Sequence, residues 1–173
     1  MKNSKGFTLV EVIIVVVIIG IMAAISIPSI SRWLPNYRLK RAARDVYSSM
    51  QKARMLAVKL NRETAIEFDP GTNKYTLCDN WSGGCIGNSQ ETDLSTIGSG
   101  VGYGHGDATS AVGSGFDNEV TYSADTAIFG PRGLGKASGY VYLDHQGNTK
   151  TYAVGSLTSG SIRILKWQGG AWK

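Results

Sequence analysis

Residues 7–30 form an almost uninterrupted apolar run, and they constrain the fold of this chain more than any other feature. Across these 24 residues the only charged side chain is that of Glu11. A helix needs ~20 apolar residues, at ~1.5 Å per residue, to cross the ~30 Å hydrocarbon core of a bilayer. The run therefore predicts a transmembrane helix over residues 7–30, and it leaves the carboxylate of Glu11 in need of a physical reason.

A new chain terminus would supply that reason. A carboxylate within a bilayer span costs free energy, up to ~2.5–3.5 kcal/mol at the bilayer centre. Cleavage between Gly6 and Phe7 would create an α-amine four residues before Glu11. Positions four apart share a face of a helix, so the ammonium and the carboxylate could pair within one chain or between neighbouring chains.

Two other interpretations of the apolar run explain less. A secretory signal peptide has an apolar core of ~7–15 residues with a small-residue cleavage site after it. Here the run is longer, and the most distinctive motif, residues 6–11, precedes it. A plain single-span anchor accounts for the apolar length but explains neither Glu11 nor the Gly6–Phe7 junction.

Residues 6–11 read GFTLVE and follow a short basic leader, residues 1–6. This pattern resembles the processing site of type IV pilins and type II secretion pseudopilins. The resemblance implies that a prepilin peptidase cuts after Gly6 and that Phe7 is then N-methylated. It also implies that Glu11 pairs with the N-terminus of a neighbouring subunit during filament assembly. The expected location is the bacterial inner membrane, crossed once, with the head in the periplasm before incorporation into a periplasmic or extracellular filament.

Charge is unevenly distributed along the 173 residues, whose formal net charge is +5. Without the leader, which carries Lys2 and Lys5, it is +3. Residues 32–62 carry a net charge of +8, whereas residues 63–162 carry −7. A basic stalk and an acidic head suggest contacts with complementary subunits or an anionic surface, and a solvated helix face accounts for the stalk equally well.

The basic stalk conflicts with the expected topology. By the positive-inside rule, the cations of residues 32–44 outnumber those of the leader and would retain the head in the cytoplasm. The family resemblance and the two cysteines indicate the periplasm. We adopt the periplasmic orientation, because leader recognition is a receptor event rather than a charge count.

Residues 31–61 have the pattern of an amphipathic helix. Apolar side chains recur at steps of three and four, which places them on one helix face. They are Leu39, Ala43, Val46, Met50, Ala53, Ala57 and Leu60.

Residues 62–173 have the pattern of a β-rich head. Residues 64–68 and 74–78 alternate about the turn at 69–73, which predicts a hairpin. Residues 83–118 hold ten glycines and predict a long loop with at most one short edge strand. Seven short strands after a long helix predict an α+β fold, with an antiparallel sheet or two-sheet sandwich packed on the helix. The other five strands are expected at 119–123, 127–129, 139–143, 149–154 and 161–167.

Four segments of the head resemble the GspH/FimT group of minor pseudopilins. They are FGPRG at 129–133, GYVYL at 139–143, YAV at 152–154 and GSIR at 160–163. The resemblance implies a non-enzymatic structural subunit of a type II secretion pseudopilus or a type IV pilus. It would act in filament initiation or tip assembly, with other major and minor pilin or pseudopilin subunits as partners.

The C-terminal strand leaves a second function open, namely DNA binding during natural transformation. In DNA-uptake members of this group a final Gly-Arg-x-Arg motif helps to bind DNA. Here Ser161 stands at the first arginine position and only Arg163 remains. Arg163 and Lys166 still lie close to Trp167 and Trp172, and cations beside aromatic rings suit nucleic acid. Alternatively, the strand simply packs its apolar residues into the head.

The two cysteines, Cys78 and Cys85, favour a disulfide in an exported domain, since six intervening residues can turn back easily. No second cysteine pair accompanies them, and His105 and His145 are isolated, so we expect no metal site. A calcium site among residues 117–119 is conceivable, but the spacing of these residues is not specific for calcium.

No phosphate loop, nucleophile elbow or metalloprotease motif occurs, and Asp144-His145 at an expected turn has no nucleophile near it in the sequence. We therefore expect no cofactor and no catalysis.

Overall fold

A computed structural model describes residues 6–113, 118–146 and 150–173, apart from the side chains of residues 26–32. The predicted leader thus lies outside this range, except for Gly6. The chain divides into two units, Met1–Leu34 and Pro35–Lys173, and each is described by itself. The long helix α1, Leu9–Leu60, contributes to both units.

In the first unit, α1 is an apolar helix with exposed side chains on every side. All described side chains from Leu9 to Ile25 are exposed. Within the described residues, no helical stretch has both the length and the apolar character needed to cross a membrane. The transmembrane helix over residues 7–30 therefore stays a prediction.

In the second unit, α1 buries the apolar face that the sequence predicts. The spacing by three and four continues to Ala57, and Ala42 joins the same face. Leu60 is the exception, because it is 37% exposed at the end of the helix. The fully buried residues of this face are Leu39, Ala42, Ala43, Val46, Met50, Ala53 and Ala57.

The C-terminus of α1 is closed by a Schellman motif. The amide of Arg62 donates to the carbonyl of Ala57 at 3.3 Å, and the amide of Asn61 donates to that of Val58 at 3.4 Å. Asn61 adopts φ 49°, a left-handed conformation that asparagine tolerates better than most residues. The hydroxyl of Thr64 then donates to the carbonyl of Ala53 at 2.8 Å, which fixes the first strand against the helix.

Two antiparallel sheets form the head. The four-stranded sheet has the order β3-β2-β1-β5, and the five-stranded sheet has the order β4-β6-β7-β8-β9. The hairpin of β1 and β2 confirms the predicted alternation, with Phe68 opposite Tyr75. Strand bounds in the first sheet are β1 Thr64–Asp69, β2 Lys74–Cys78, β3 Ser89–Asp93 and β5 Thr126–Phe129. Those in the second are β4 Val101–Tyr103, β6 Gly139–His145, β7 Tyr152–Ser156, β8 Ile162–Gln168 and β9 Ala171–Trp172.

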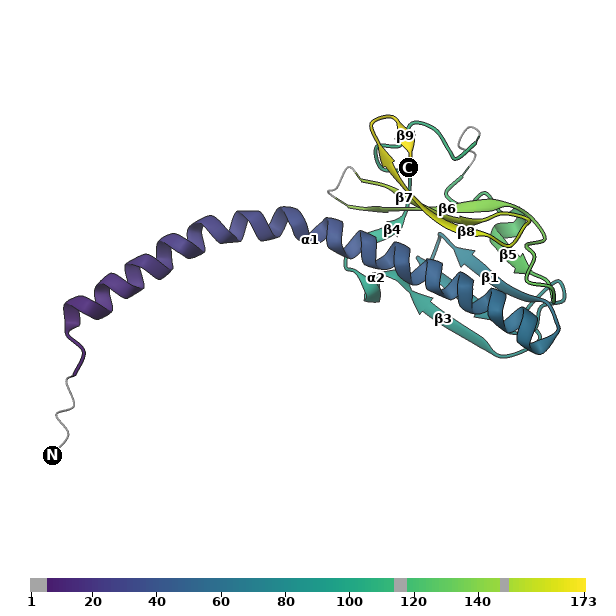
Figure 1. Cartoon of the computed structure of the whole chain (residues 1–173), viewed down its shortest axis with the longest axis horizontal. Helices are drawn as coiled ribbons and strands as arrows, with labels where there is room; N and C mark the ends of the chain where they lie inside the picture. Colours follow the sequence, from purple (N-terminus) through teal and green to yellow (C-terminus); the bar gives the residue numbers. More distant parts are fainter. Residues whose placement is uncertain (1–5, 114–117, 147–149) are drawn as a thin grey trace. The chain divides into compact units, whose positions relative to one another are not determined.

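In the second unit α1 lies alongside both sheets (Figure 1), and a single large core joins it to them. It contains Met50 of α1, Ile66 and Phe129 of the first sheet, and Val141 and Val154 of the second. The fold is thus α+β, with an N-terminal helix packed on antiparallel sheets, as expected. A smaller cluster built around Tyr142 lies on the other face of the five-stranded sheet.

The predicted strands were wrong in several places. The loop over residues 83–118 contains two strands, β3 and β4, and the short helix α2, Leu94–Ile97. Residues 119–123 form no regular strand; within them Val120 makes an isolated bridge to Val141, and Ser123 begins the short 3-10 helix η1, Ser123–Asp125. Strand β7 begins at Tyr152 rather than at residue 149, and β9 was not predicted. Residues 147 and 148 of the expected turn lie outside the described residues.

Candidate functional site

The predicted cleavage junction lies ahead of α1, outside regular secondary structure. Phe7 is 80% exposed. A methyl group added at Gly6 would meet no atom within 4 Å. The Gly6–Phe7 bond therefore lies in exposed, non-helical backbone, the kind of segment that proteases cut most readily.

Glu11 lies in the first turn of α1, where a negative charge interacts favourably with the helix dipole. Thr8 immediately precedes the helix, and its hydroxyl accepts a hydrogen bond from the amide of Glu11 at 3.3 Å. Thr8 and Glu11 have the spacing of a capping box, in which the two side chains satisfy free amides at a helix start. The sequence contains this signal, but the prediction considered Glu11 only as a partner for a new α-amine.

The structure places Arg163 and Lys166 on opposite faces of β8. Side chains alternate along a strand, so residues three apart point away from each other. Ile162 and Ile164 pack on the main core, and Lys166 lies on their face, opposite Tyr152 of β7. Leu165 packs on the cluster around Tyr142, and the exposed Arg163 shares its face. The two cations of the alternative DNA-binding function are therefore not brought together.

The two C-terminal tryptophans pack on each other rather than forming an open stacking platform. Trp167 and Trp172 make an edge-to-face contact with ring centroids 5.2 Å apart. The indole of Trp172 also donates to the carbonyl of Ser110 at 2.8 Å and lies 5.4 Å from the ring of Tyr142. These contacts show one role of the glycine-rich segment, which covers the outer face of the five-stranded sheet.

Cys78 and Cys85 form a disulfide, as the sequence predicts, with their Cα atoms 5.7 Å apart. The enclosed loop is fixed to the end of α1 as well. Arg62 forms an ion pair with Asp79 at 3.1 Å, and the amide of Trp81 donates to the carbonyl of Glu63 at 2.9 Å. Hydrogen bonds from Asn88, together with Arg62, lower the pKa of Asp79.

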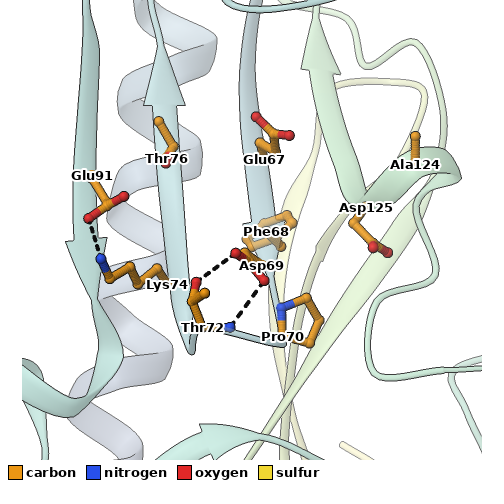
Figure 2. A pocket seen from close by; sticks show the side chains of 10 residues that line it. All are labelled: Glu67, Phe68, Asp69, Pro70, Thr72, Lys74, Thr76, Glu91, Ala124 and Asp125. Carbon is orange, nitrogen blue, oxygen red and sulfur yellow. Dashed lines mark hydrogen bonds and ion pairs between the residues drawn. The ribbon is translucent and has the colours of Figure 1, made fainter.

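An acidic groove of about 410 Å³ lies on the outer face of the four-stranded sheet (Figure 2). Lys74 forms an ion pair with Glu91 at 2.7 Å, which raises the pKa of Lys74. The hydroxyl and the amide of Thr72 donate to Asp69 and lower its pKa. Among the described residues no group of three or more His, Cys, Asp or Glu side chains is suited to a metal ion. Asp117 of the considered calcium site lies outside that range.

His145 ends strand β6 rather than lying in a turn beside Asp144. Its ring is buried, with Nε2 3.0 Å from the carbonyl oxygen of Ser99 and Nδ1 2.6 Å from that of Gln146. These contacts connect β6 to the segment that precedes β4. The other histidine, His105, has Nε2 3.2 Å from the carbonyl oxygen of Asn118.

Comparison with solved structures agrees with this architecture. The fold is similar to that of the type IV minor pilin FimU from Pseudomonas aeruginosa, with a TM-score of 0.52 over 82% of this chain and 96% of FimU. The identity is 14%, so the likeness concerns the fold alone. A long N-terminal helix, apolar in its first part and packed on a β-rich head in its second, defines a pilin-like protein.

Two family matches specify the family of pilin-like proteins to which this chain belongs. Residues 1–27 match the prokaryotic N-terminal methylation motif, and residues 42–160 match the family described as type II transport protein GspH. The chain belongs to the GspH family.

Curated relatives match through shorter stretches. A fimbrial protein of Pseudomonas aeruginosa is 38% identical over 77 residues, which is 44% of this chain and 49% of the relative. The competence protein ComGC of Bacillus subtilis (strain 168) is 39% identical over 61 residues, or 35% of this chain and 60% of ComGC. The chain thus spans about half the length of the fimbrial protein it matches.

Proposed function

We propose that this chain is a minor pilin or pseudopilin, a non-enzymatic structural subunit of a type IV pilus or a type II secretion pseudopilus. The observation that carries the proposal is the helix surface after the Gly6–Phe7 junction. From Leu9 to Ile25 it is apolar on all sides except for Glu11, and every side chain in this stretch is exposed. A helix that is apolar all round is buried in its functional state. Lipid would cover it before assembly, and the helices of other subunits would cover it within a filament.

Processing converts the apolar helix into an assembly element. A prepilin peptidase cuts between Gly6 and Phe7, and Phe7 is then N-methylated. The new amine carries a positive charge next to the apolar run. Glu11 of a neighbouring subunit pairs with it, and the low dielectric around the helices strengthens that pairing while it penalises an unpaired charge. Because the rest of the run is uncharged, this pair sets the axial position of an incoming subunit.

A minor role, in filament initiation or at the tip, is supported by the match of the head to the GspH family. The head then faces the periplasm, anchored by the inner-membrane helix. Its disulfide suits that oxidising compartment. DNA capture has weaker support, since Arg163 and Lys166 lie on opposite faces of β8.

Mass spectrometry of the protein extracted from membranes tests the proposal. In cells with an active prepilin peptidase we expect a chain of residues 7–173 with a methylated Phe7. In cells that lack the peptidase we expect the chain to begin at the leader. An unprocessed start in peptidase-positive cells would contradict the proposal.

A further inference from the structure

Most of the large exposed apolar side chains of the second unit belong to the end of α1 or to segments bound to it. The last two turns of the helix expose Met55 to 64% and Val58 to 55%. Three further large apolar side chains are exposed on segments fixed to the same helix end. Leu60 belongs to α1 itself. Ile86 follows the disulfide loop that Arg62 binds, and Leu134 follows a corner formed by residues 129–133. Among the described residues of this unit, only Tyr37 is a large exposed apolar residue elsewhere. Met55 and Val58 lie three residues apart on one face of α1, where neighbouring exposed apolar side chains mark an interaction surface.

The corner at residues 129–133 fixes the geometry of this surface. The guanidinium Nε of Arg54 donates to the carbonyl of Gly133 at 3.0 Å. Gly133 has φ +72° and is buried, and a Cβ there would lie 3.1 Å from Val58 Cγ2. Glycine suits this position, because other residues rarely adopt such a φ and a Cβ would be tight against Val58. Gly160 lies close against the backbone of Gly133, and a Cβ at Gly160 would lie 2.0 Å from the carbonyl oxygen of Gly133. The corner is thus rigid against α1.

An open groove of about 320 Å³ lies along this part of the helix, lined by Gln51, Arg54, Met55, Val58 and Lys59. Met55 and Val58 are its apolar lining residues, and Arg54 and Lys59 are its cationic ones. Lys59 and, next to Gly133, Arg132 are both exposed. In the part of the chain that the structure describes, the ion pairs involve neither of them.

The geometry points to a docking site for a different pilin-like subunit, one that places an apolar side chain in the groove and surrounds it with carboxylates. The inference rests on the proposed function and specifies where the subunit meets its neighbour. Carboxylates on the partner would complement Lys59 and Arg132. An apolar anchor in a groove is the usual centre of such contacts.

A second copy of this chain is a poorer partner, because neither way of docking it supplies both carboxylates and an apolar anchor. A two-fold contact would oppose like charges at the groove edges. A head-to-tail contact through the acidic face of Figure 2 would bring carboxylates but no anchor. Among the residues that line that groove, Phe68 is the one large apolar side chain, and it is buried.

Site-specific photocrosslinking on the full-length chain in assembly-competent cells tests the inference. The photoreactive residue is p-benzoyl-phenylalanine at Met55, and the matched control carries it at Ser48. Ser48 is also exposed and lies on the same helix face two turns earlier. We expect Met55 to crosslink to a pilin-like subunit other than this chain, with an adduct yield about tenfold above that at Ser48. The crosslinked peptide, identified by mass spectrometry, should contain carboxylates.

Charge substitutions give a second measurement. Met55→Glu and Val58→Glu should lower co-purification with that subunit about tenfold, whereas Ser48→Glu should not. Lys59→Glu combined with Arg132→Glu should weaken it as well, and raised salt should reduce that difference. All these side chains are exposed, so the head should keep its disulfide and its resistance to protease.

Adducts with a second copy, with lipid or with an unrelated protein would overturn the inference, as would equal yields at Met55 and Ser48. The proposed function is scored separately, by the presence of the wild-type chain in sheared filaments or in complexes with pilin-like subunits. If the chain is present there without a Met55 adduct, the docking site alone is wrong. If it is absent, the proposed function is wrong and the docking site with it.

Discussion

Glu11 has two physical reasons for its place at the start of an apolar helix. As the fourth residue of the capping-box spacing that begins at Thr8, it favours the start of α1 at Leu9. As the only charge in the apolar run, it is also the partner that we propose for a new N-terminal amine. The first role needs a hydrogen-bonding side chain, whereas the second needs a negative charge, so substitutions can separate them.

We expect Glu11→Gln and Glu11→Ala to reduce incorporation into filaments about tenfold or more. Both remove a charge-assisted contact, which contributes ~1.5–3 kcal/mol. Glutamine retains the capping box, because it can still accept a hydrogen bond from the amide of Thr8. Thr8→Ala is the matched control: it weakens the cap by ~0.5–2 kcal/mol but leaves the carboxylate in place. Recovery of each variant in sheared filaments, normalised to its membrane level, measures the effect.

Normal incorporation of Glu11→Gln with a loss in Thr8→Ala would reverse the assignment. Helix capping would then be the main role of Glu11, and apolar packing between helices would set the position of each subunit.

At the scale of elements, β8 shows how alternation along a strand limits function. Its two cations lie three residues apart and therefore on opposite faces. One face is directed to the core that includes α1, and the other to the cluster around Tyr142. A single phosphate backbone could follow one face of this strand but not both.

We therefore expect weak binding of DNA, with at most one phosphate contact from β8. Arg163→Ala should then change the slope of log K against log salt by about 0.9 or less on duplex DNA, and Lys166→Ala should leave the slope unchanged. Fluorescence anisotropy of labelled duplex and single strands, with the detergent-solubilised full chain between 50 and 200 mM salt, measures it. A steep slope that both substitutions reduce would instead favour DNA uptake as the function.

At the scale of the whole head, buried tyrosines connect elements distant in sequence. The hydroxyl of Tyr75 on β2 donates to Asp45 on α1 and lies 2.9 Å from the hydroxyl of Ser49. The hydroxyl of Tyr122 lies 2.8 Å from that of Ser156 and accepts from its amide at 2.7 Å. Burial raises the pKa of Tyr75 to about 12, and that of Tyr122 to about 12.

These shifts predict a loss of stability in alkali. A tyrosine whose pKa is raised in the folded state stabilises the fold fully below its unfolded pKa of about 10. That contribution declines as the pH rises from about 10 to 12, by at most ~1.4 kcal/mol per pH unit for each group. Tyr75→Phe should be less stable than wild type at pH 8, by ~1–3 kcal/mol, because Asp45 and Ser49 lose a partner. Its free energy of unfolding should nevertheless decline less steeply above pH 10.

Urea unfolding of the full chain in detergent, followed by near-ultraviolet circular dichroism between pH 8 and pH 12, measures both curves. Parallel curves for wild type and Tyr75→Phe would show that this hydroxyl does not titrate in the transition.

The sequence by itself determined the features that depend on local periodicity. The spacing of three and four places Leu39 to Ala57 on one face, since any helix brings such positions together. Alternation on both sides of a turn determines the hairpin of β1 and β2. The pairing of Cys78 with Cys85 needs no information beyond the presence of two cysteines close in sequence. The motif at residues 6–11 also identified the N-terminal segment, because it is contiguous.

Only the tertiary structure decided which distant segments meet. Strand β3, with the polar sequence SQETD, shows no apolar alternation, and it forms because β2 offers it an open edge. Strands β4 and β9 are too short to leave a pattern and exist through pairing with β6 and β8. The alternation that separates Arg163 from Lys166 holds for any strand, yet which face of β8 meets the core depends on α1. The hydrogen bond from Arg54 to Gly133 likewise joins a helix end and a corner that are almost eighty residues apart. Contacts at such separations depend on the packing of the whole core, which no local pattern records.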